Sequence, residues 1–245
     1  MHGWRGRIGL LAPSPLMTLE PEFYKIIPEG ISVHATRLMH TSSTYEGLAS
    51  LSDNIERGAE ELATAKVDVI AFACTSGGVI KGEEYEIELK ERITRASGGI
   101  PAVTVIGSVV DALKTFNINK LVISTPYVHD VFNREKDFME KKGFQVLDIR
   151  GLGIEESELI SREPSSTSYR MSKEMFYEYP EAEGIFISCT NYRSIEIIDK
   201  LEKDTGVPVV SSVQATLWNC LKKVKCFEPI IGHGKLLESM RAGLE

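Results

Sequence analysis

Short runs of hydrophobic residues recur along the chain, and most are apolar along their whole length, which is typical of strands buried on both faces of a sheet. The predicted strands span residues 7–12, 31–38, 67–73, 101–106, 120–126, 145–151, 184–189 and 208–213. Charged, helix-like stretches lie between them, at 20–26, 45–64, 82–97, 107–116, 128–142, 155–159, 167–178, 192–205, 211–224 and 235–242. This alternation predicts an α/β protein with mainly parallel sheets flanked by helices.

One pattern occurs in both halves of the chain. VDVIAFACTSGG at 67–78 and EGIFISCTNYRS at 183–194 each pass from a buried-type strand into Cys-Thr and then Ser or Asn. After a helical stretch, each leads to a second matching phrase, GGIPAVTVIGSVVDAL at 98–113 and TGVPVVSSVQATLW at 205–218. The repetition predicts two similar, pseudo-symmetric lobes.

Each predicted lobe contributes one strand-end cysteine. We assign residues 1–115 to the first lobe, which carries Cys74 and is completed by 208–245, and residues 116–207 to the second lobe, which carries Cys189. If a pseudo-twofold axis relates the lobes, the two thiols face each other across the cleft between them.

Composition and charge narrow the class of protein. The chain has 245 residues, of which 42% are hydrophobic, and a net charge of −7, which argues against a nucleic-acid partner because phosphate binding needs a basic excess. No run of about 18 apolar residues predicts a membrane span, and IGLLA near the start is too short for a signal-peptide core. We therefore expect a cytoplasmic protein that associates with no membrane.

The cysteines match neither a disulfide framework nor a metal site. Four cysteines in an intracellular chain stay reduced, and none has a zinc-ligand spacing to another cysteine or to a histidine. Neither a G-x-G-x-x-G nor a P-loop motif occurs. We expect no metal and no organic cofactor, and we interpret Cys220 and Cys226 as structural or surface residues.

The carboxyl ends of parallel strands are where α/β proteins bind ligands, and both Cys74 and Cys189 are predicted there. Small polar residues after each cysteine let backbone N–H groups approach an anion, and a helix N-terminus would favour both a carboxylate and a thiolate. The candidate binding residues that follow the cysteines are Thr75, Ser76, Thr190 and Asn191.

Two thiols on opposite sides of one carbon suit racemisation, cis–trans isomerisation by addition to a double bond, or protonation of the carbanion left by decarboxylation. The alternative is that each cysteine is a buried small hydrophobe, and the matched phrases favour the functional interpretation. Tyr127, at the end of the STPY strand, is a candidate contact for a carboxylate oxygen, and Ser14 is a candidate contact in the first loop. The scattered histidines, including His40, are interpreted as structural.

These phrases resemble a known family. RIGLLAPSPLMTLEPEFYKIIPEGISVHATRL, AFACTSGG, STPY, GIFISCTN and GVPVVSSVQATLW are similar, in this order, to segments of maleate cis-trans isomerases and arylmalonate decarboxylases of the Asp/Glu racemase superfamily. The resemblance covers most of residues 7–224. It implies two Rossmann-like lobes with the site between them.

The resemblance also implies roles. Cys74 matches the nucleophile of the isomerases and Cys189 their acid/base partner, whereas the decarboxylases carry glycine at the first position. Tyr127 matches a carboxylate-contacting tyrosine. The isomerase loop usually reads close to PSSNTT, and here it reads PSPLMT, so that Leu16 stands where the family has a substrate-contacting asparagine.

We therefore expect a cofactor-independent isomerase of a small mono- or dicarboxylic acid that acts through Cys74 and Cys189. Racemisation of an amino acid or hydantoin and decarboxylation of a substituted malonate are the alternatives, and a non-enzymatic carboxylate-binding protein is the third. We expect a homodimer or a higher homo-oligomer.

Overall fold

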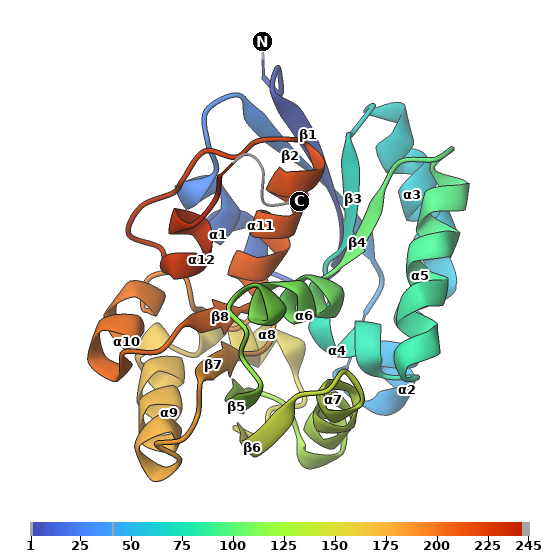
Figure 1. Ribbon diagram of the computed structural model, residues 1–245. Coiled ribbons are helices and arrows are strands. Elements are labelled where there is room, and N and C mark those ends of the chain that lie inside the picture. Colours follow the sequence, from blue (N-terminus) through green and yellow to red (C-terminus); the bar gives the residue numbers. More distant parts are fainter. Residues whose placement is uncertain (1, 41, 242–245) are drawn as a thin grey trace.

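Two parallel sheets form the frame of the protein in the computed structural model, which describes residues 2–40 and 42–241 (Figure 1). The first sheet has the strand order β2-β1-β3-β4 and the second has the order β6-β5-β7-β8. The strands are β1 (Gly6–Pro13), β2 (Ile31–Leu38), β3 (Val69–Phe72), β4 (Ala102–Thr104), β5 (Lys120–Thr125), β6 (Gln145–Gly151), β7 (Gly184–Ile187) and β8 (Val209–Ser211). The identical order in the two sheets confirms the predicted duplication and the α/β fold.

Every strand pair is parallel, and the inner strands are buried on both faces. Each residue of β3 and of β7 is buried, as their uninterrupted apolar sequences predict. Parallel strands end at the same edge of a sheet, so that the segments following β1, β3, β5 and β7 converge. The two matched cysteines follow β3 and β7, and the fold therefore places them at these edges.

Helices cover the sheets as the sequence pattern predicts, with local differences. They are α1 (Leu19–Ile26), α2 (Tyr45–Ser50), the 3₁₀ helix η1 (Leu51–Asn54), α3 (Ile55–Thr64), α4 (Thr75–Val79), α5 (Glu83–Ala96), α6 (Val105–Thr115), α7 (His129–Lys141), α8 (Ser157–Arg162), α9 (Ser165–Glu178), α10 (Ile198–Thr205), α11 (Ser212–Lys223) and α12 (Lys235–Glu238). Residues 1, 41 and 242–245 lie outside the described residues, and with them the end of the helix predicted at 235–242 and the last residues of the predicted first lobe.

Two predicted helices were wrong in their extent. The stretch 45–64 divides into α2, η1 and α3, because its centre, SLSDN, is rich in side chains that compete for backbone hydrogen bonds. The helix predicted at 192–205 begins only at Ile198. The buried Glu22 carboxylate accepts the backbone N–H groups of Ser194 (3.0 Å) and Ile195 (3.4 Å), and so holds this segment in a turn.

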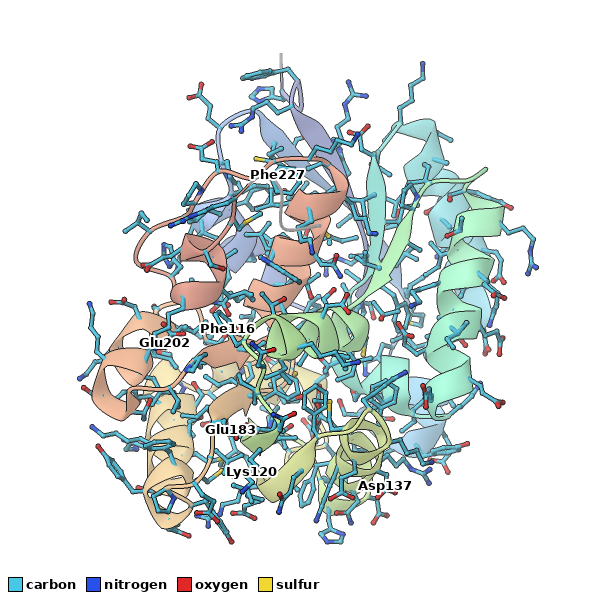
Figure 2. All side chains as sticks on the ribbon, in the orientation of Figure 1. Phe116, Lys120, Asp137, Glu183, Glu202 and Phe227 are labelled. Carbon is cyan, nitrogen blue, oxygen red and sulfur yellow. The ribbon has the colours of Figure 1, made fainter. Side chains whose placement is uncertain are left out.

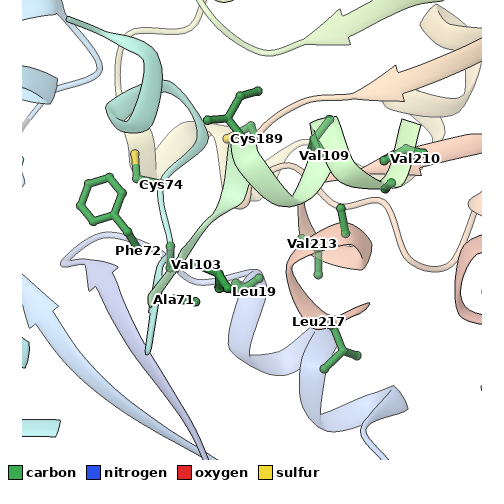
Figure 3. Close-up of a cluster of buried hydrophobic side chains, with 14 of the residues drawn as sticks. Leu19, Ala71, Phe72, Cys74, Val103, Val109, Cys189, Val210, Val213 and Leu217 are labelled. Atoms are coloured by element: carbon green, nitrogen blue, oxygen red, sulfur yellow. The ribbon is translucent and has the colours of Figure 1, made fainter. Parts of the chain in front are cut away.

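The C-terminal segment joins the two sheets. Strand β8 pairs with β7 in the second sheet, whereas α11 packs against α6 and also contacts β3 and β4 (Figure 1). Val109 of α6 and Val213 and Leu217 of α11 all belong to the buried cluster of Figure 3, in which Val213 lies on the side of α11 toward α6. Because 208–241 contacts both halves of the molecule, its assignment to the first lobe stays a prediction.

At the amino ends of the strands of the second sheet, away from the cysteines, a carboxylate binds backbone N–H groups. Glu183 accepts the backbone N–H groups of Asn119 (2.6 Å) and Lys120 (3.1 Å) at the start of β5 (Figure 2). These bonds satisfy donors that the sheet leaves unpaired and lower the pKa of Glu183. These bonds give this end of the sheet a structural role.

No helix of the described residues is long and apolar enough to cross a bilayer.

Candidate active site

Cys74 and Cys189 reach one cavity from the two sheets. Cys74 lies just beyond the last residues of β3, as Figure 3 shows with Phe72, and Cys189 follows β7. Their exposed fractions are 7% and 6%, and both line the same cavity between the lobes. The structure thus brings together the two residues that the duplicated phrases singled out.

The cavity is small and narrow. Its volume of about 20 Å³ is little more than the 10–15 Å³ that one water molecule needs. A four-carbon acid therefore enters only when the walls move apart. The walls come from six segments and contain Pro13, Leu16, His40, Ser43, Leu48, Cys74, Ser76, Tyr127, Ser157, Ile160, Cys189, Thr190 and Asn191. Among the described residues, no group of three or more His, Cys, Asp or Glu side chains is placed to hold a metal ion.

The Cys74 thiol caps a short helix. Its Sγ accepts the backbone N–H of Gly77 at 3.3 Å and lies 3.8 Å from the Ser76 hydroxyl. These contacts favour a thiolate, but burial has the larger effect and raises the pKa of Cys74 to about 11. The predicted thiolate-favouring helix N-terminus is therefore present, although in the narrow cavity it does not offset the loss of solvation.

The Cys189 loop differs from its counterpart. Cys189 has φ = 99°, which is rare for a residue with a side chain, and a turn follows it instead of the predicted helix. Its Sγ accepts the backbone N–H of Asn191 at 3.3 Å. Burial raises the pKa of Cys189 to about 12, while the Tyr127 hydroxyl and the Asn191 N–H oppose this rise. A negative charge on Cys74 raises the pKa of Cys189 further, so the ionisation of one thiol affects that of the other.

Hydrogen bonds tie the two cysteine loops across the lobes. The Thr75 hydroxyl donates to Ser212 Oγ at 2.9 Å, and the same oxygen accepts the Cys189 backbone N–H at 3.0 Å. Thr190 Oγ1 donates to the carbonyl of Ala73 at 3.0 Å. Thr190 lines the cavity, whereas the fully buried Thr75 lies behind it. We did not predict Ser212 as a site residue, although it lies within the repeated phrase VVSS.

The Asn191 side chain is occupied by structural bonds. Its Oδ1 accepts the backbone N–H groups of Met17 (2.9 Å) and Thr18 (3.2 Å), and its Nδ2 donates to the Ser157 carbonyl (2.7 Å). These bonds hold the first loop against the second lobe and place the buried Leu16 in the cavity wall. Asn191 therefore shapes the cavity in this form of the protein.

Ser14 lies apart from the other predicted site residues. It is exposed and does not line the cavity. Its hydroxyl instead donates to the backbone carbonyl of His40 at 3.2 Å and accepts the backbone N–H of His40 at 3.1 Å. His40, which we interpreted as structural, lines the cavity.

A buried carboxyl group lies behind Tyr127 and Cys189. Tyr127 is 2% exposed and lines the cavity, and its pKa is raised by burial and by the neighbouring Cys189 and Glu135. Glu135 on α7 is fully buried and accepts the Ser188 hydroxyl at 2.5 Å. Burial raises the pKa of Glu135 to about 7. Sequence reasoning missed this residue because HDVFNREKDFMEK is typical of a solvated helix.

The duplicated parallel sheets and the narrow cavity with a cysteine from each define a two-lobed α/β protein with paired strand-end thiols. The chain belongs to the arylmalonate decarboxylase family, whose model matches residues 8–237. This confirms the resemblance that the sequence phrases indicated.

The relatives include two kinds of enzyme. The maleate isomerase of Pseudomonas putida (strain KT2440) is 28% identical over 94% of this chain and 96% of its own length. The arylmalonate decarboxylase of Bordetella bronchiseptica is 25% identical over 88% of this chain and 89% of its own length. The predicted assignment to an enzyme family is confirmed.

Solved structures share the fold. The maleate isomerase of Pseudomonas putida S16 with maleate has a TM-score of 0.89 at 24% identity and covers 95% of this chain and 97% of its own. A cysteine-to-serine variant of the Nocardia farcinica maleate cis-trans isomerase, which carries a covalently bound succinylcysteine intermediate, has a TM-score of 0.90 at 23% identity and covers 95% and 98%.

Proposed function

We propose that the protein is a cofactor-independent cis–trans isomerase of a small unsaturated dicarboxylic acid such as maleate. The observation that carries the proposal is the meeting of Cys74 and Cys189 in one narrow cavity, beside the Tyr127 hydroxyl. The maleate isomerases among the relatives support it. Addition and elimination of a thiol needs no other reagent, so the residues present suffice for the chemistry.

The first step is the addition of Cys74. In the narrow cavity both thiols are protonated, and entry of substrate with water lets the Cys74 proton leave to solvent. The thiolate, stabilised by the Gly77 N–H, forms a bond from sulfur to one alkene carbon. The π electron pair moves to the other alkene carbon, and the Cys189 thiol protonates that carbon. Tyr127 lines the same cavity, and in the proposed reaction its hydroxyl donates a hydrogen bond to the substrate carboxylate on which negative charge develops.

The second step reverses the first after rotation. The bond between the two central carbons is now single, and rotation about it relieves the contact between the two carboxylates. After the rotation the original hydrogen of the protonated carbon faces Cys189, and the Cys189 thiolate removes this hydrogen as a proton, the double bond re-forms, and the carbon–sulfur bond to Cys74 breaks. The products are the trans acid and the original pair of a Cys74 thiolate and a Cys189 thiol, so atoms and electrons balance.

Decarboxylation of a substituted malonate is the second candidate. The apolar side chains of Leu16, Leu48 and Ile160 in the cavity wall favour it, because they disfavour a carboxylate placed against them. Release of carbon dioxide from a substituted malonate by the wild-type protein marks this reaction. Racemisation is distinguished by the loss of optical rotation of an enantiopure amino acid or hydantoin.

Proton NMR of maleate incubated with the protein tests the proposal. We expect fumarate to appear with the wild-type protein and to be absent, or slowed at least about 100-fold, with Cys74→Ser. Cys220→Ala is the matched control, because Cys220 is a buried cysteine of α11 outside the cavity, and it is expected to retain activity. Absence of fumarate with wild-type protein that is folded by circular dichroism would refute the proposed substrate.

A further inference from the structure

The cavity wall contains a buried histidine whose ring has an unpaired nitrogen. His40 lies two residues beyond the end of β2 and is 7% exposed, and it lines the cavity that holds both cysteines. Its Nδ1 has no hydrogen-bond partner within the described residues. Buried polar atoms in native proteins are rarely unpaired, so we expect this nitrogen to gain a partner that arrives with the ligand.

The backbone of His40 is fixed relative to the first loop. The Ser14 hydroxyl bonds both the N–H and the carbonyl of His40, at 3.1 and 3.2 Å. Ser14 lies two residues before Leu16, and both Leu16 and His40 line the cavity. The bonds of Ser14 therefore link the two segments that carry the leucine and the imidazole. Leu16 offers no hydrogen bond to a ligand, and the His40 ring does.

The wall that contains His40 includes both hydroxyl and apolar side chains. Ser43 and Ser157 also line the cavity, and Leu48 and Ile160 are its apolar neighbours in the wall. Burial lowers the pKa of His40 against the smaller opposing effect of a hydrogen bond with the Gly47 backbone, so the ring is neutral when no ligand is bound, and a carboxylate that arrives at Nδ1 favours the form of the ring with a proton on that nitrogen. A carboxylate against the ring would gain a hydrogen bond that Leu16 does not provide.

We propose that His40 determines substrate specificity by binding the second carboxylate of a four-carbon dicarboxylate whose first carboxylate lies near Tyr127 and the cysteine loops. The unpaired buried Nδ1 in the shared cavity carries the proposal. It rests on the proposed function only in placing the ligand at this site. In this role, His40 selects dicarboxylates over monocarboxylates of the same length.

Calorimetric titration with succinate and with butyrate tests it without requiring catalysis, because neither ligand has a double bond to which a thiol adds. We expect wild-type protein to bind succinate at least about tenfold more tightly than butyrate. His40→Leu is expected to lose this preference while its affinity for butyrate stays within about twofold of wild type. His34→Leu is the matched control, because His34 lies on β2, bonds Ser32 and is absent from the cavity wall, and this variant is expected to keep the preference.

A second measurement distinguishes direct contact between His40 and the ligand from a purely structural role of His40. The ring resonances of His40, assigned by their loss in His40→Leu, are expected to shift on addition of succinate to wild-type protein and to stay in place on addition of butyrate. Retention of the succinate preference by His40→Leu, absence of any succinate binding to wild-type protein, or unmoved ring resonances at saturating succinate would each overturn the proposal. Succinate binding that depends on His40, together with failure to isomerise maleate, would refute the proposed function and leave this inference standing.

Discussion

At each of the two thiols, burial and nearby N–H donors have opposite effects on the pKa. Cys74 receives the Gly77 N–H and Cys189 receives the Asn191 N–H, the arrangement that favours a thiolate. Burial nevertheless raises the pKa of the two groups to about 11 and about 12. Without a ligand, Cys74, the proposed nucleophile, is therefore held as a thiol, and a substrate or an opening of the cavity is needed to form the thiolate.

Alkylation by iodoacetamide measures this balance. We expect Cys74 and Cys189 to react at about pH 7 more slowly than a free cysteine derivative, with rates that rise steeply only above about pH 9, because the thiolate is the reacting form. Mass spectrometry of the two cysteine peptides follows the reaction, and succinate is expected to slow it further. A rate that is already at its plateau at about pH 7 would show that the donors outweigh burial.

Among the secondary-structure elements, the strands were predicted by their apolar patterns. The helix ends were instead decided by side chains that bind backbone N–H or carbonyl groups. The buried strands could be predicted because short, uninterrupted apolar runs between helical stretches are typical of parallel strands that are covered on both faces. The division of 45–64 follows from its local SLSDN sequence, whereas the late start of α10 depends on a contact distant in sequence, that of Glu22 with Ser194, which no local pattern reveals. Helix α7 likewise hides a buried carboxyl, Glu135, within a charged sequence.

The buried Glu135 predicts a pH-dependent stability. Its pKa is raised from 4.5 to about 7 in the folded protein, so its contribution is fully present below about pH 4.5 and is lost as the pH rises through about 7. Glu135→Gln keeps the shape and an acceptor for Ser188 without the charge. We expect the free energy of unfolding of this variant, relative to wild type, to rise by about 3 kcal/mol between about pH 4.5 and about pH 8.

Urea unfolding of both proteins at several pH values within this range measures the difference. Glu22 is present in both proteins and its similar titration cancels in the comparison. A difference in unfolding free energy that does not vary with pH would show that Glu135 titrates normally in the folded state.

At the scale of the whole molecule, the duplication explains why so much of the site could be predicted. Two matched phrases and the rule that parallel strands end at one edge were enough to place Cys74 and Cys189 together. The cross-lobe bonds of Thr75 and Thr190 to Ser212 and Ala73 were not predictable, since they join segments that no sequence pattern pairs. The position of His40 in the cavity wall likewise depends on how segments distant in sequence pack together.

In the proposed mechanism, thiols from the two lobes act in turn on one double bond. Cys189→Ser should leave the adduct of maleate on Cys74 in place, because water can supply the proton of the first step but no thiolate is left to remove a proton in the second. Mass spectrometry of this variant after incubation with maleate is therefore expected to show the mass of one added maleic acid on the peptide that contains Cys74, and no such addition in Cys74→Ser. Absence of an adduct in Cys189→Ser, or an adduct on Cys220 or Cys226 instead, would contradict the account.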